Sequence, residues 1–566
     1  MSCMSPDAQL HAAMAPNDLL EMLRAPHASF FSTQDTSKWI QHAQSDLLKY
    51  EKQIQQHQSH IQQLRAKQVA LRRDIARYSS LSSPVRKLPS EILRRIFGLA
   101  SLHNRFGKGP FLEEWSSGAF IMGSICSRWR EIAINAPELW SSISFRFEER
   151  AFRPVQLCLS RSGNHHLNLD VDSGLYDYDD DEEFREIEGF CRVLTEHRTR
   201  WRHLNVAHAG STLIPYMVNR SRTETPSLES ITCCEWNIED LRSCLLGPGA
   251  RTIQDVSISF KDRLAPFTSI SDVFPWRTMR HLEMDYDGQE TLDGLCEALR
   301  LGGNLQSLTY TGMAYTNEDG PYEGTSGRFR DHVRVVSNIK SLTIAFYDLE
   351  GFYGILHDLF RSCTLPSLTS LTISCPDNHY KFPQKDYLGG IWPYRLLNEC
   401  LELSGCTLTT LTLGGLLLLE PEVVSLLHSA PSIHSFTLSE LGATTTYGNP
   451  PEYLPQTITK SLLKRLHGTM LSDDVFSIQH PILTKLTFLK LQAQFRFDAD
   501  EEFVDLVKSR WFKPDGSSPS GDTERLRTVV LHVRNRKLLP DTYLPLTWIE
   551  SDGMMVSVLN DEQRII

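Results

Sequence analysis

The sequence predicts a mixed α/β protein built from three successive parts: a long amphipathic helix, a short helical segment, and a large region of alternating strands and helices. Three observations lead to this prediction. Apolar residues recur every seven positions between residues 47 and 78, and two amphipathic helical patterns follow between residues 84 and 145. A short apolar triad then returns eleven times up to residue 531. The 566 residues are enough for about two to four domains with a sizeable core.

Composition narrows the class of protein. The hydrophobic fraction of 41% and the charged fraction of 22% are ordinary for a globular chain. A net charge of -11 argues against a general nucleic-acid binder, because such binding needs Lys and Arg to neutralise phosphates. The twelve cysteines form no C-x-x-C pair, which indicates reduced thiols. The start of the chain lacks signal-peptide character, and no apolar run approaches the roughly 20 residues that span a bilayer. We expect a cytoplasmic or nuclear protein that binds neither nucleic acid nor membrane.

The first part of the chain predicts a coiled-coil helix over residues 41–79. Residues 1–40 show no sustained periodicity, so we expect a mostly disordered tail there. Two heptad series then run in parallel, Leu47, Ile54, Ile61, Gln68 and Ile75 at a, and Tyr50, His57, Leu64, Leu71 and Tyr78 at d. His57 and Gln68 interrupt the apolar seam. The pattern leaves two structures open, a homodimer through the coiled coil or a single amphipathic helix that folds back on its own chain.

Residues 84–145 predict two helices followed by a strand. Pro89 suits the first turn of a helix, and Glu91 is favourable at the same end of the helix dipole. A loop over residues 107–118 ends this helix. One further amphipathic helix is predicted to carry Ile121, Ile125, Cys126, Trp129 and Ile132, after which Pro137 to Trp140 stop it and Ile143 and Phe145 open a strand.

Three short patterns in this segment resemble an F-box of the type abundant in basidiomycete fungi. They are Leu88-Pro89-x-Glu91-Ile92-Leu93-x-x-Ile96-Phe97, then Ile125-Cys126-x-x-Trp129-Arg130, then Pro137-x-Leu139-Trp140. The resemblance implies a small all-α three-helix module that binds the adaptor subunit of a Skp–cullin–F-box (SCF) ubiquitin ligase and, through it, a cullin. The residues that it assigns to adaptor binding are Leu88, Pro89, Glu91, Ile92, Leu93, Ile96, Phe97, Ile125, Cys126, Trp129, Pro137, Leu139 and Trp140. The sequence departs from the pattern in the long stretch 98–119 between the first two helices.

A physical argument supports an interface independently of the family. A segment this small has little interior in which to cover two apolar helices. Some of its large apolar residues should therefore face a partner. The candidates are Leu88, Ile92, Ile96, Phe97, Trp129 and Trp140. The alternative is that these side chains pack against the C-terminal region of the same chain.

The C-terminal two-thirds repeat an L-x-x-L-x-L pattern, which is typical of a strand with its inward positions filled. The triads are 201/204/206, 228/231/233, 253/256/258, 279/282/284, 305/308/310, 339/342/344, 368/371/373, 408/411/413, 433/436/438, 486/489/491 and 526/529/531. The first five recur at about 26 residues, the spacing of leucine-rich repeats. Later intervals are wider, so we expect inserted loops or a missed strand, for which Leu463 and Leu466 are candidates. Helical patterns at 291–301 and 421–429 separate the strands.

Residues 146–566 are therefore predicted to form an irregular leucine-rich-repeat-like α/β solenoid whose strands line a binding face. Polar residues between the strand leucines, such as Thr407, Thr409, Thr410 and Thr412, would carry specificity. The alternative is a different α/β or all-β fold with coincidental spacing.

No phosphate-binding loop, dinucleotide fingerprint, zinc-protease motif or nucleophile elbow occurs in the sequence. We therefore expect no catalytic residue, cofactor or metal. The combined patterns predict a non-catalytic substrate-recognition subunit of an SCF-type ligase, with an F-box-like domain at 84–145 and an unknown target protein bound by the repeats. One alternative is an interaction scaffold that acts without a ligase. Another is an enzyme in the C-terminal region, whose sign would be a deep polar pocket with clustered His, Asp and Glu.

Overall fold

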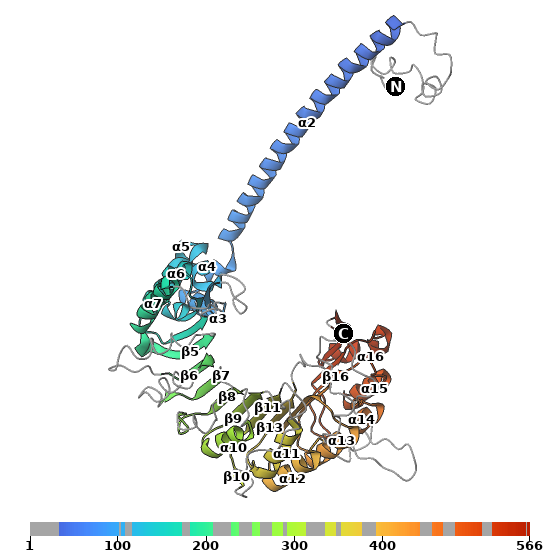
Figure 1. Cartoon of the computed structure of the whole chain (residues 1–566). Helices are drawn as coiled ribbons and strands as arrows, with labels where there is room; N and C mark the ends of the chain where they lie inside the picture. Colours follow the sequence, from blue (N-terminus) through green and yellow to red (C-terminus); the bar gives the residue numbers. More distant parts are fainter. Residues whose placement is uncertain are drawn as a thin grey trace. The chain divides into compact units, whose positions relative to one another are not determined.

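The protein is mixed α/β, with a long N-terminal helix and a large, mostly parallel sheet (Figure 1). The computed structural model describes residues 33–100, 103–107, 116–172, 181–207, 228–236, 252–260, 274–286, 291–312, 334–346, 352–375, 392–441, 455–467, 482–511, 523–561 and 563–566. The chain divides into two compact units, Met1–Leu93 and Arg94–Ile566. No helix within the described residues combines the length and the apolar character needed to cross a membrane.

The long helix of the first unit is α2, Thr33–Leu81, with 49 residues. It contains neither glycine nor proline, so no residue inside it breaks the hydrogen-bond ladder. The helix predicted over 41–79 is present, but it begins earlier, and residues 33–40 are helical rather than part of a disordered tail. The rest of the predicted tail, 1–32, lies outside the described residues. A 3-10 turn, η2 (Pro84–Lys87), follows α2.

The segment expected to be all-α contains short strands as well. Its first helix is α3, Ser90–Ala100, and the carbonyl of Pro89 accepts the first intrahelical bond, from the Leu93 amide. The second predicted helix is two helices, because the extended backbone of Cys126 (φ -158°, ψ 168°) separates them. These are α4 (Gly118–Ile125) and α5 (Ser127–Ile134), followed by the 3-10 turn η3 (Pro137–Trp140). Between α3 and α4 lie β1 (Asn104–Phe106) and β2 (Ser116–Ser117).

The sheet begins inside this segment. β1 pairs with β2 in the antiparallel sense and with β3 (Ser142–Arg146) in the parallel sense. From β3 onward each strand of the large sheet pairs in parallel with the next, up to β18 (Met555–Asn560), and the short β19 (Gln563–Arg564) returns antiparallel to it. The strands between are β4 (Leu167–Asp172), β5 (Trp201–Ala207), β6 (Ser230–Trp236), β7 (Asp255–Phe260), β8 (His281–Tyr286), β9 (Ser307–Gly312), β11 (Ser341–Phe346), β13 (Ser370–Ser374), β14 (Thr410–Leu416), β15 (Ser435–Glu440), β16 (Phe488–Ala493) and β17 (Thr528–Val533).

All eleven predicted triads lie at strands of this sheet, and all their side chains are buried. Their register is matched, since Leu308 of β9 lies opposite Leu342 of β11, which in turn lies opposite Leu371 of β13. The strand suggested at Leu463 and Leu466 is wrong, because these residues lie in and just after the helix α14 (Lys460–Arg465). A spacing of three residues fits a helix face as well as it fits this strand pattern.

The connecting helices of the C-terminal half follow one another along one face of the sheet (Figure 1). α10 has the predicted bounds, Thr291–Leu301, and α13 begins one residue before its predicted start, at Glu420–Ser429. Neighbouring helices contact each other from α10 to α13 and from α14 to α16. The other helices of this series are α11 (Phe352–Ser362), α12 (Tyr394–Ser404), α15 (Asp500–Trp511) and α16 (Pro540–Ser551). They are preceded in the chain by α6 (Glu149–Arg161), α7 (Asp181–Thr195) and the 3-10 turn η4 (Arg198–Arg200). A separate two-stranded pair, β10 (Val335–Val336) and β12 (Cys363–Thr364), completes the described elements.

A buried arginine joins two of these helices to the chain between them. Arg510, on α15, donates hydrogen bonds of 2.8–2.9 Å to the carbonyls of Leu466, Ile482 and Leu483. Leu466 caps the C-terminal end of α14, where helix carbonyls lack intrahelical partners. Leu483 has a positive φ of 57° and its carbonyl is one of the three acceptors. Burial lowers the pKa of Arg510 to about 10, so the three carbonyl bonds offset a substantial desolvation cost.

We predict that Arg510→Met lowers the free energy of unfolding by about 3 kcal/mol, because three buried carbonyls lose their donor. Chemical denaturation of the full chain measures this difference. The matched control is Lys508→Met on the same helix, where the lysine is partly exposed and its contact is a surface ion pair with Asp505. Equal stability losses for the two variants would contradict a structural role for Arg510.

Candidate protein-interaction surfaces

Helix α3 has one apolar face buried and another exposed. Leu93 and Phe97 are completely buried, whereas Ile92 and Ile96 are each more than two-fifths exposed and Leu99 is 74% exposed. Positions four apart share a helix face, so Ile92 and Ile96 lie together, next to the buried pair. An apolar face that stays exposed costs solvation free energy that a partner would recover.

Two contacts hold α3 to the helices that follow it. The ring of Phe97 packs against the ring of Trp129 on α5, with centroids 4.7 Å apart. Arg94 makes a two-pronged ion pair with Glu138 in η3, in which Nη2 donates to Oε2 at 2.6 Å and Nε donates to Oε1. The hydrogen bond from Arg94 lowers the pKa of the Glu138 carboxyl. The exposed face of α3 is therefore presented in a defined orientation relative to α5 and η3.

Helix α4 repeats this arrangement. Its Ile121 and Ile125, four residues apart, are 53% and 55% exposed, while Ala119 is buried. The hydroxyl of Ser117 caps the helix by accepting from the amide of Phe120. Ile134 at the end of α5 is also exposed. Sequence reasoning placed Ile121 on an amphipathic helix but did not assign it to the interface, although its spacing from Ile125 is the signal that would have done so.

Trp140 is a core residue rather than a surface one. Its indole N–H donates to the carbonyl of Ala133 at 2.7 Å, and its ring makes an edge contact with Phe120 and lies 4.5 Å from the guanidinium of Arg161. Only 1% of Trp140 is exposed, and its neighbour Leu139 is also buried. Of the six residues among which some were predicted to face a partner, Trp140 is therefore one whose side chain lies in the core.

The thirteen residues assigned to adaptor binding fall into three groups in the structure. Exposed side chains are those of Pro89, Glu91, Ile92, Ile96 and Ile125. Partly exposed ones are Leu88, Cys126, Trp129 and Pro137. The buried ones are Leu93, Phe97, Leu139 and Trp140. The buried group shapes the segment, and only the first two groups are accessible to another protein.

A second surface is the face of the sheet opposite the buried triads. From β9 to β15 it carries two rows of hydroxyl side chains, paired strand by strand. The first row is Ser307, Ser341, Ser370, Thr410 and Ser435, and the second is Thr309, Thr343, Thr372, Thr412 and Thr437. All ten are partly exposed. We call them the hydroxyl rows; adjacent members are about 4.8 Å apart because that is the spacing of strands.

Charged side chains lie beyond both ends of the hydroxyl rows. On β7 and β8 the exposed positions include Asp255, Glu283 and Asp285, and Ser257 donates to Glu283 at 3.0 Å. On the other side Lys490 of β16 lies opposite Thr437. Of the threonines expected to carry specificity, Thr410 and Thr412 are members of the rows. The face as a whole can offer a partner hydrogen bonds in its middle and charge at its ends.

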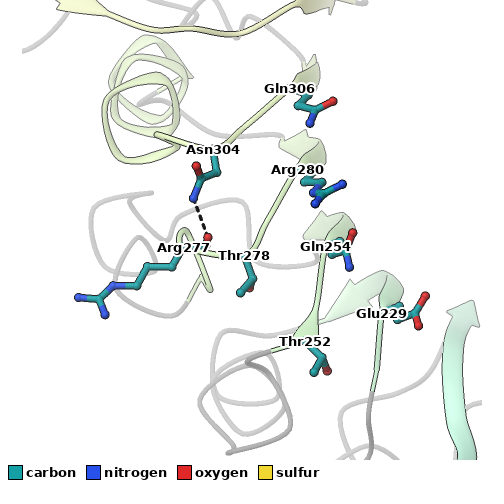
Figure 2. A pocket seen from close by; sticks show the side chains of 8 residues that line it. All are labelled: Glu229, Thr252, Gln254, Arg277, Thr278, Arg280, Asn304 and Gln306. Atoms are coloured by element: carbon teal, nitrogen blue, oxygen red, sulfur yellow. Dashed lines mark hydrogen bonds between the residues drawn. The ribbon is translucent and has the colours of Figure 1, made fainter.

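A polar pocket of about 680 Å³ lies where four successive strands begin. Glu229, Gln254, Arg280 and Gln306 immediately precede β6, β7, β8 and β9, and Figure 2 shows them in a row. The remaining described lining residues are Thr252, Arg277, Thr278 and Asn304, whose amide donates to the Arg277 carbonyl at 2.7 Å. The described lining of this pocket holds one carboxylate, that of Glu229, and no histidine.

A smaller polar hollow of about 210 Å³ lies on the exposed face of the first strands. His103 Nδ1 is 2.7 Å from the Ser142 hydroxyl, and Asn205 donates to Asp170 at 3.0 Å. Burial raises the pKa of the Asp170 carboxyl, and a hydrogen bond from Ser144 opposes this rise. Sequence reasoning missed this group, because its members come from separate segments that only the strand register brings together.

Among the described residues of the hollow, no hydrogen bond joins His103 to Asp170, although His103 lies near enough to act on its charge. The serine next to His103 is Ser142, whereas the hydrogen bonds described for Asp170 involve Ser144 and Asn205. A base must be oriented by its own carboxylate partner for nucleophilic catalysis by a serine. Within the described residues, no three His, Cys, Asp or Glu side chains gather as metal ligands would. The hollow is suited to hydrogen bonding with a bound partner.

No protein-family model and no curated protein sequence matches the chain.

The raised pKa of Asp170 gives a pH-dependent prediction. Because the folded state disfavours the carboxylate, Asp170 makes the fold less stable as pH rises from its unfolded pKa through its higher folded pKa. Asp170→Asn should therefore raise Tm at pH 7 relative to wild type, and the gain should vanish near pH 3. Ser144→Ala, which removes a bond that favours the carboxylate, should have the opposite effect at pH 7. Thermal melts across this pH range measure both; a gain for Asp170→Asn that is independent of pH would contradict the assignment.

Proposed function

We propose that the chain is the substrate-recognition subunit of an SCF-type ubiquitin ligase and has no catalytic activity of its own. Residues 84–145 act as an F-box-like module that binds the ligase adaptor and, through it, a cullin. The strands and helices that follow act as an irregular leucine-rich-repeat-like solenoid that binds a target protein. The chain holds the target protein close to the other subunits of the ligase, and those subunits carry out the ubiquitin transfer.

The observation that carries the proposal is the exposed apolar surface of α3 and α4. Ile96, Ile121 and Ile125 are 41–55% exposed and Leu99 more so, although the same helices bury other apolar residues. Burying one such side chain fully is worth about 1.5–3 kcal/mol, and association costs about 4–15 kcal/mol. Because the three isoleucines are already about half buried, covering each one gains about half of that value. A partner must therefore cover the whole set together with neighbouring side chains in order to bind, and no single isoleucine would suffice.

The sequence patterns lie on successive short helices of this segment, in an order that supports the family resemblance. The first pattern starts α3, the second runs from the end of α4 into α5, and the third is η3. Three short helices are what the resemblance implies. The pairs β1–β2 and β1–β3 between and beside them are additions to that pattern, and they accommodate part of the long stretch 98–119.

The repeat region supports target binding by its chemistry. The hydroxyl rows present ten small polar side chains, none of them charged and all of them partly exposed, on one face of the sheet. Small side chains let another protein approach the strands closely, and hydroxyls both donate and accept hydrogen bonds. A scaffold that acts without a ligase would use this same face, so the two functions differ in whether the α3–α4 surface binds an adaptor.

We expect the full chain to co-purify with the SCF adaptor subunit in a stoichiometric complex. The variant Ile96→Asp/Ile125→Asp should weaken this complex by about 100-fold or more, because the apolar contacts of two half-exposed side chains are lost and each is replaced by a carboxylate that the partner would desolvate. Both side chains are exposed, so the fold should be unaffected; circular dichroism checks this. Trp129→Ala is a poorer probe, since Trp129 packs on Phe97.

The matched control is Leu544→Asp/Trp548→Asp on α16, where two apolar side chains four residues apart are likewise exposed. This control should bind the adaptor like the wild type. A folded wild type that forms no complex would overturn the ligase proposal and leave the scaffold. Equal losses for the two double variants would show that the contact is nonspecific.

A further inference from the structure

The apolar seam of α2 is exposed along its whole length. The eight apolar residues at its heptad positions between 47 and 78 are 48–75% exposed. They are Leu47, Tyr50, Ile54, Ile61, Leu64, Leu71, Ile75 and Tyr78. A helix of this length with such a seam is stable when a second helix covers it.

We propose that α2 pairs with α2 of a second copy of this chain in an antiparallel coiled coil, with Ile61 opposite Leu64 of the second copy. This inference concerns the helix alone and does not depend on the ligase function. It specifies orientation and register, and two independent features of the helix lead to it: the positions of the polar residues in the seam and the charges beside the seam.

The polar positions determine the antiparallel register. In an antiparallel pair each a residue faces a d residue of the other helix. With Ile61 opposite Leu64, the layers are Leu47–Tyr78, Ile54–Leu71, Ile61–Leu64, Gln68–His57 and Ile75–Tyr50. Every apolar residue then meets an apolar one, and the two polar residues meet each other. An amide and an imidazole can exchange a hydrogen bond, which a buried polar pair requires.

A shift of one heptad in either direction destroys this match. In one direction His57 faces Ile61 and Gln68 faces Tyr50; in the other, Gln68 faces Leu64 and His57 faces Ile75. Each shift also leaves an unmatched layer at the ends. Polar residues at seam positions are known to select register at some cost in stability. Gln68 and His57 therefore favour one antiparallel alignment over its neighbours.

The charges beside the seam favour antiparallel over parallel pairing. In a parallel, in-register pair, g of one helix faces e of the next heptad on the other. This places Asp46 against Glu51 and Lys67 against Arg72, each twice by symmetry. In the antiparallel register e faces e, and Glu51 instead meets Arg72, again twice. Like charges repel and opposite charges attract by similar amounts, so the two orientations differ in the sign of the flanking interactions.

The charge distribution along the helix points the same way. Residues 33–57 carry three acidic and three basic side chains, whereas residues 58–81 carry five basic and one acidic. Parallel pairing would bring the two basic halves together. Antiparallel pairing places each basic half beside a neutral one. Ion pairs within the helix, Lys49–Asp46 and Arg77–Asp74, are compatible with this arrangement because both lie outside the seam.

The geometry has a consequence for the assembly. The matched layers run from residue 47 to residue 78, about 47 Å of helix at 1.5 Å per residue. In an antiparallel pair the two chains continue from opposite ends of this rod. Two copies of whatever follows α2 would be attached at opposite ends of the pair, rather than side by side as in a parallel coiled coil.

Charge reversal at one position tests orientation, because the two arrangements predict opposite effects. In the antiparallel pair, Glu51→Arg replaces both attractive contacts with Arg72 by repulsive ones and should raise the dimer Kd about tenfold at low ionic strength. Arg72→Glu should do the same. In a parallel pair, Glu51→Arg would face Asp46 and Arg72→Glu would face Lys67, so each variant would dimerise more tightly. Sedimentation equilibrium of the full chain measures Kd.

Mixing provides the sharper measurement. Equal amounts of the Glu51→Arg and Arg72→Glu chains should form a heterodimer tighter than either homodimer. In the antiparallel heterodimer the new arginine at position 51 of one chain meets the new glutamate at position 72 of the other, and the native Arg72 meets the native Glu51, so both flanking pairs attract. In each homodimer both pairs repel. Lys52→Glu, on the outer face of the same helix, is the matched control and should leave Kd unchanged. A wild-type chain that is monomeric throughout the concentration range would overturn the proposal, and so would tighter dimerisation of either single variant. Since α2 is exposed, unchanged helicity by circular dichroism shows that no variant has unfolded.

Discussion

The matched register of the parallel strands is the constraint on which the rest of the sheet depends. Each strand must place its buried side chains beside those of its neighbours, since a shift of one residue would turn the apolar set toward solvent. Leu342, between Leu308 and Leu371, shows how this works at the centre of the sheet. The constraint acts on the strands and leaves the connections free. Connections of different length between successive strands, with helices of different length, therefore still produce one continuous sheet. The same register also orders the side chains of the opposite face into rows.

The same constraint explains what could be read from the sequence. The triads are local patterns, so all eleven were predictable, and a long glycine- and proline-free heptad run made α2 predictable as well. Interactions between distant segments were not. Trp140, Ile143 and Phe145 have the spacing of a triad, but the same tryptophan also belongs to a motif whose residues suggest an interface. The interruption at Cys126 is a backbone angle that no apolar pattern encodes, and the group around Asp170 exists only through strand register.

The three exposed surfaces differ in chemistry, and the difference follows from the element that carries each. Helices α3 and α4 expose compact isoleucine faces because their other faces fill a small core. The sheet exposes hydroxyls because period two assigns every second residue to the open face. Helix α2 exposes a continuous seam because seven-residue periodicity keeps one stripe apolar over many turns. Each surface suits a different class of contact. The isoleucine faces suit an apolar contact of small area, the hydroxyl rows suit hydrogen bonding, and the seam of α2 suits pairing with the same helix of a second copy.

Trp140 also determines where the chain can be divided. Trp140 is the last residue of η3, and together with Ile143 and Phe145 it also has the spacing of a triad. The helical segment therefore covers the end of the sheet, as a terminal cap does in a repeat protein. A shortened chain that begins after residue 146 would lose β1 and β3 and leave β4 as an open edge, with a row of unpaired amides and carbonyls available to other molecules. The complementary fragment would expose Ile143 and Phe145. A shortened chain that keeps the strands from β4 onward should therefore also keep the residues before 146, so that β3, itself paired with β1, covers the edge of β4.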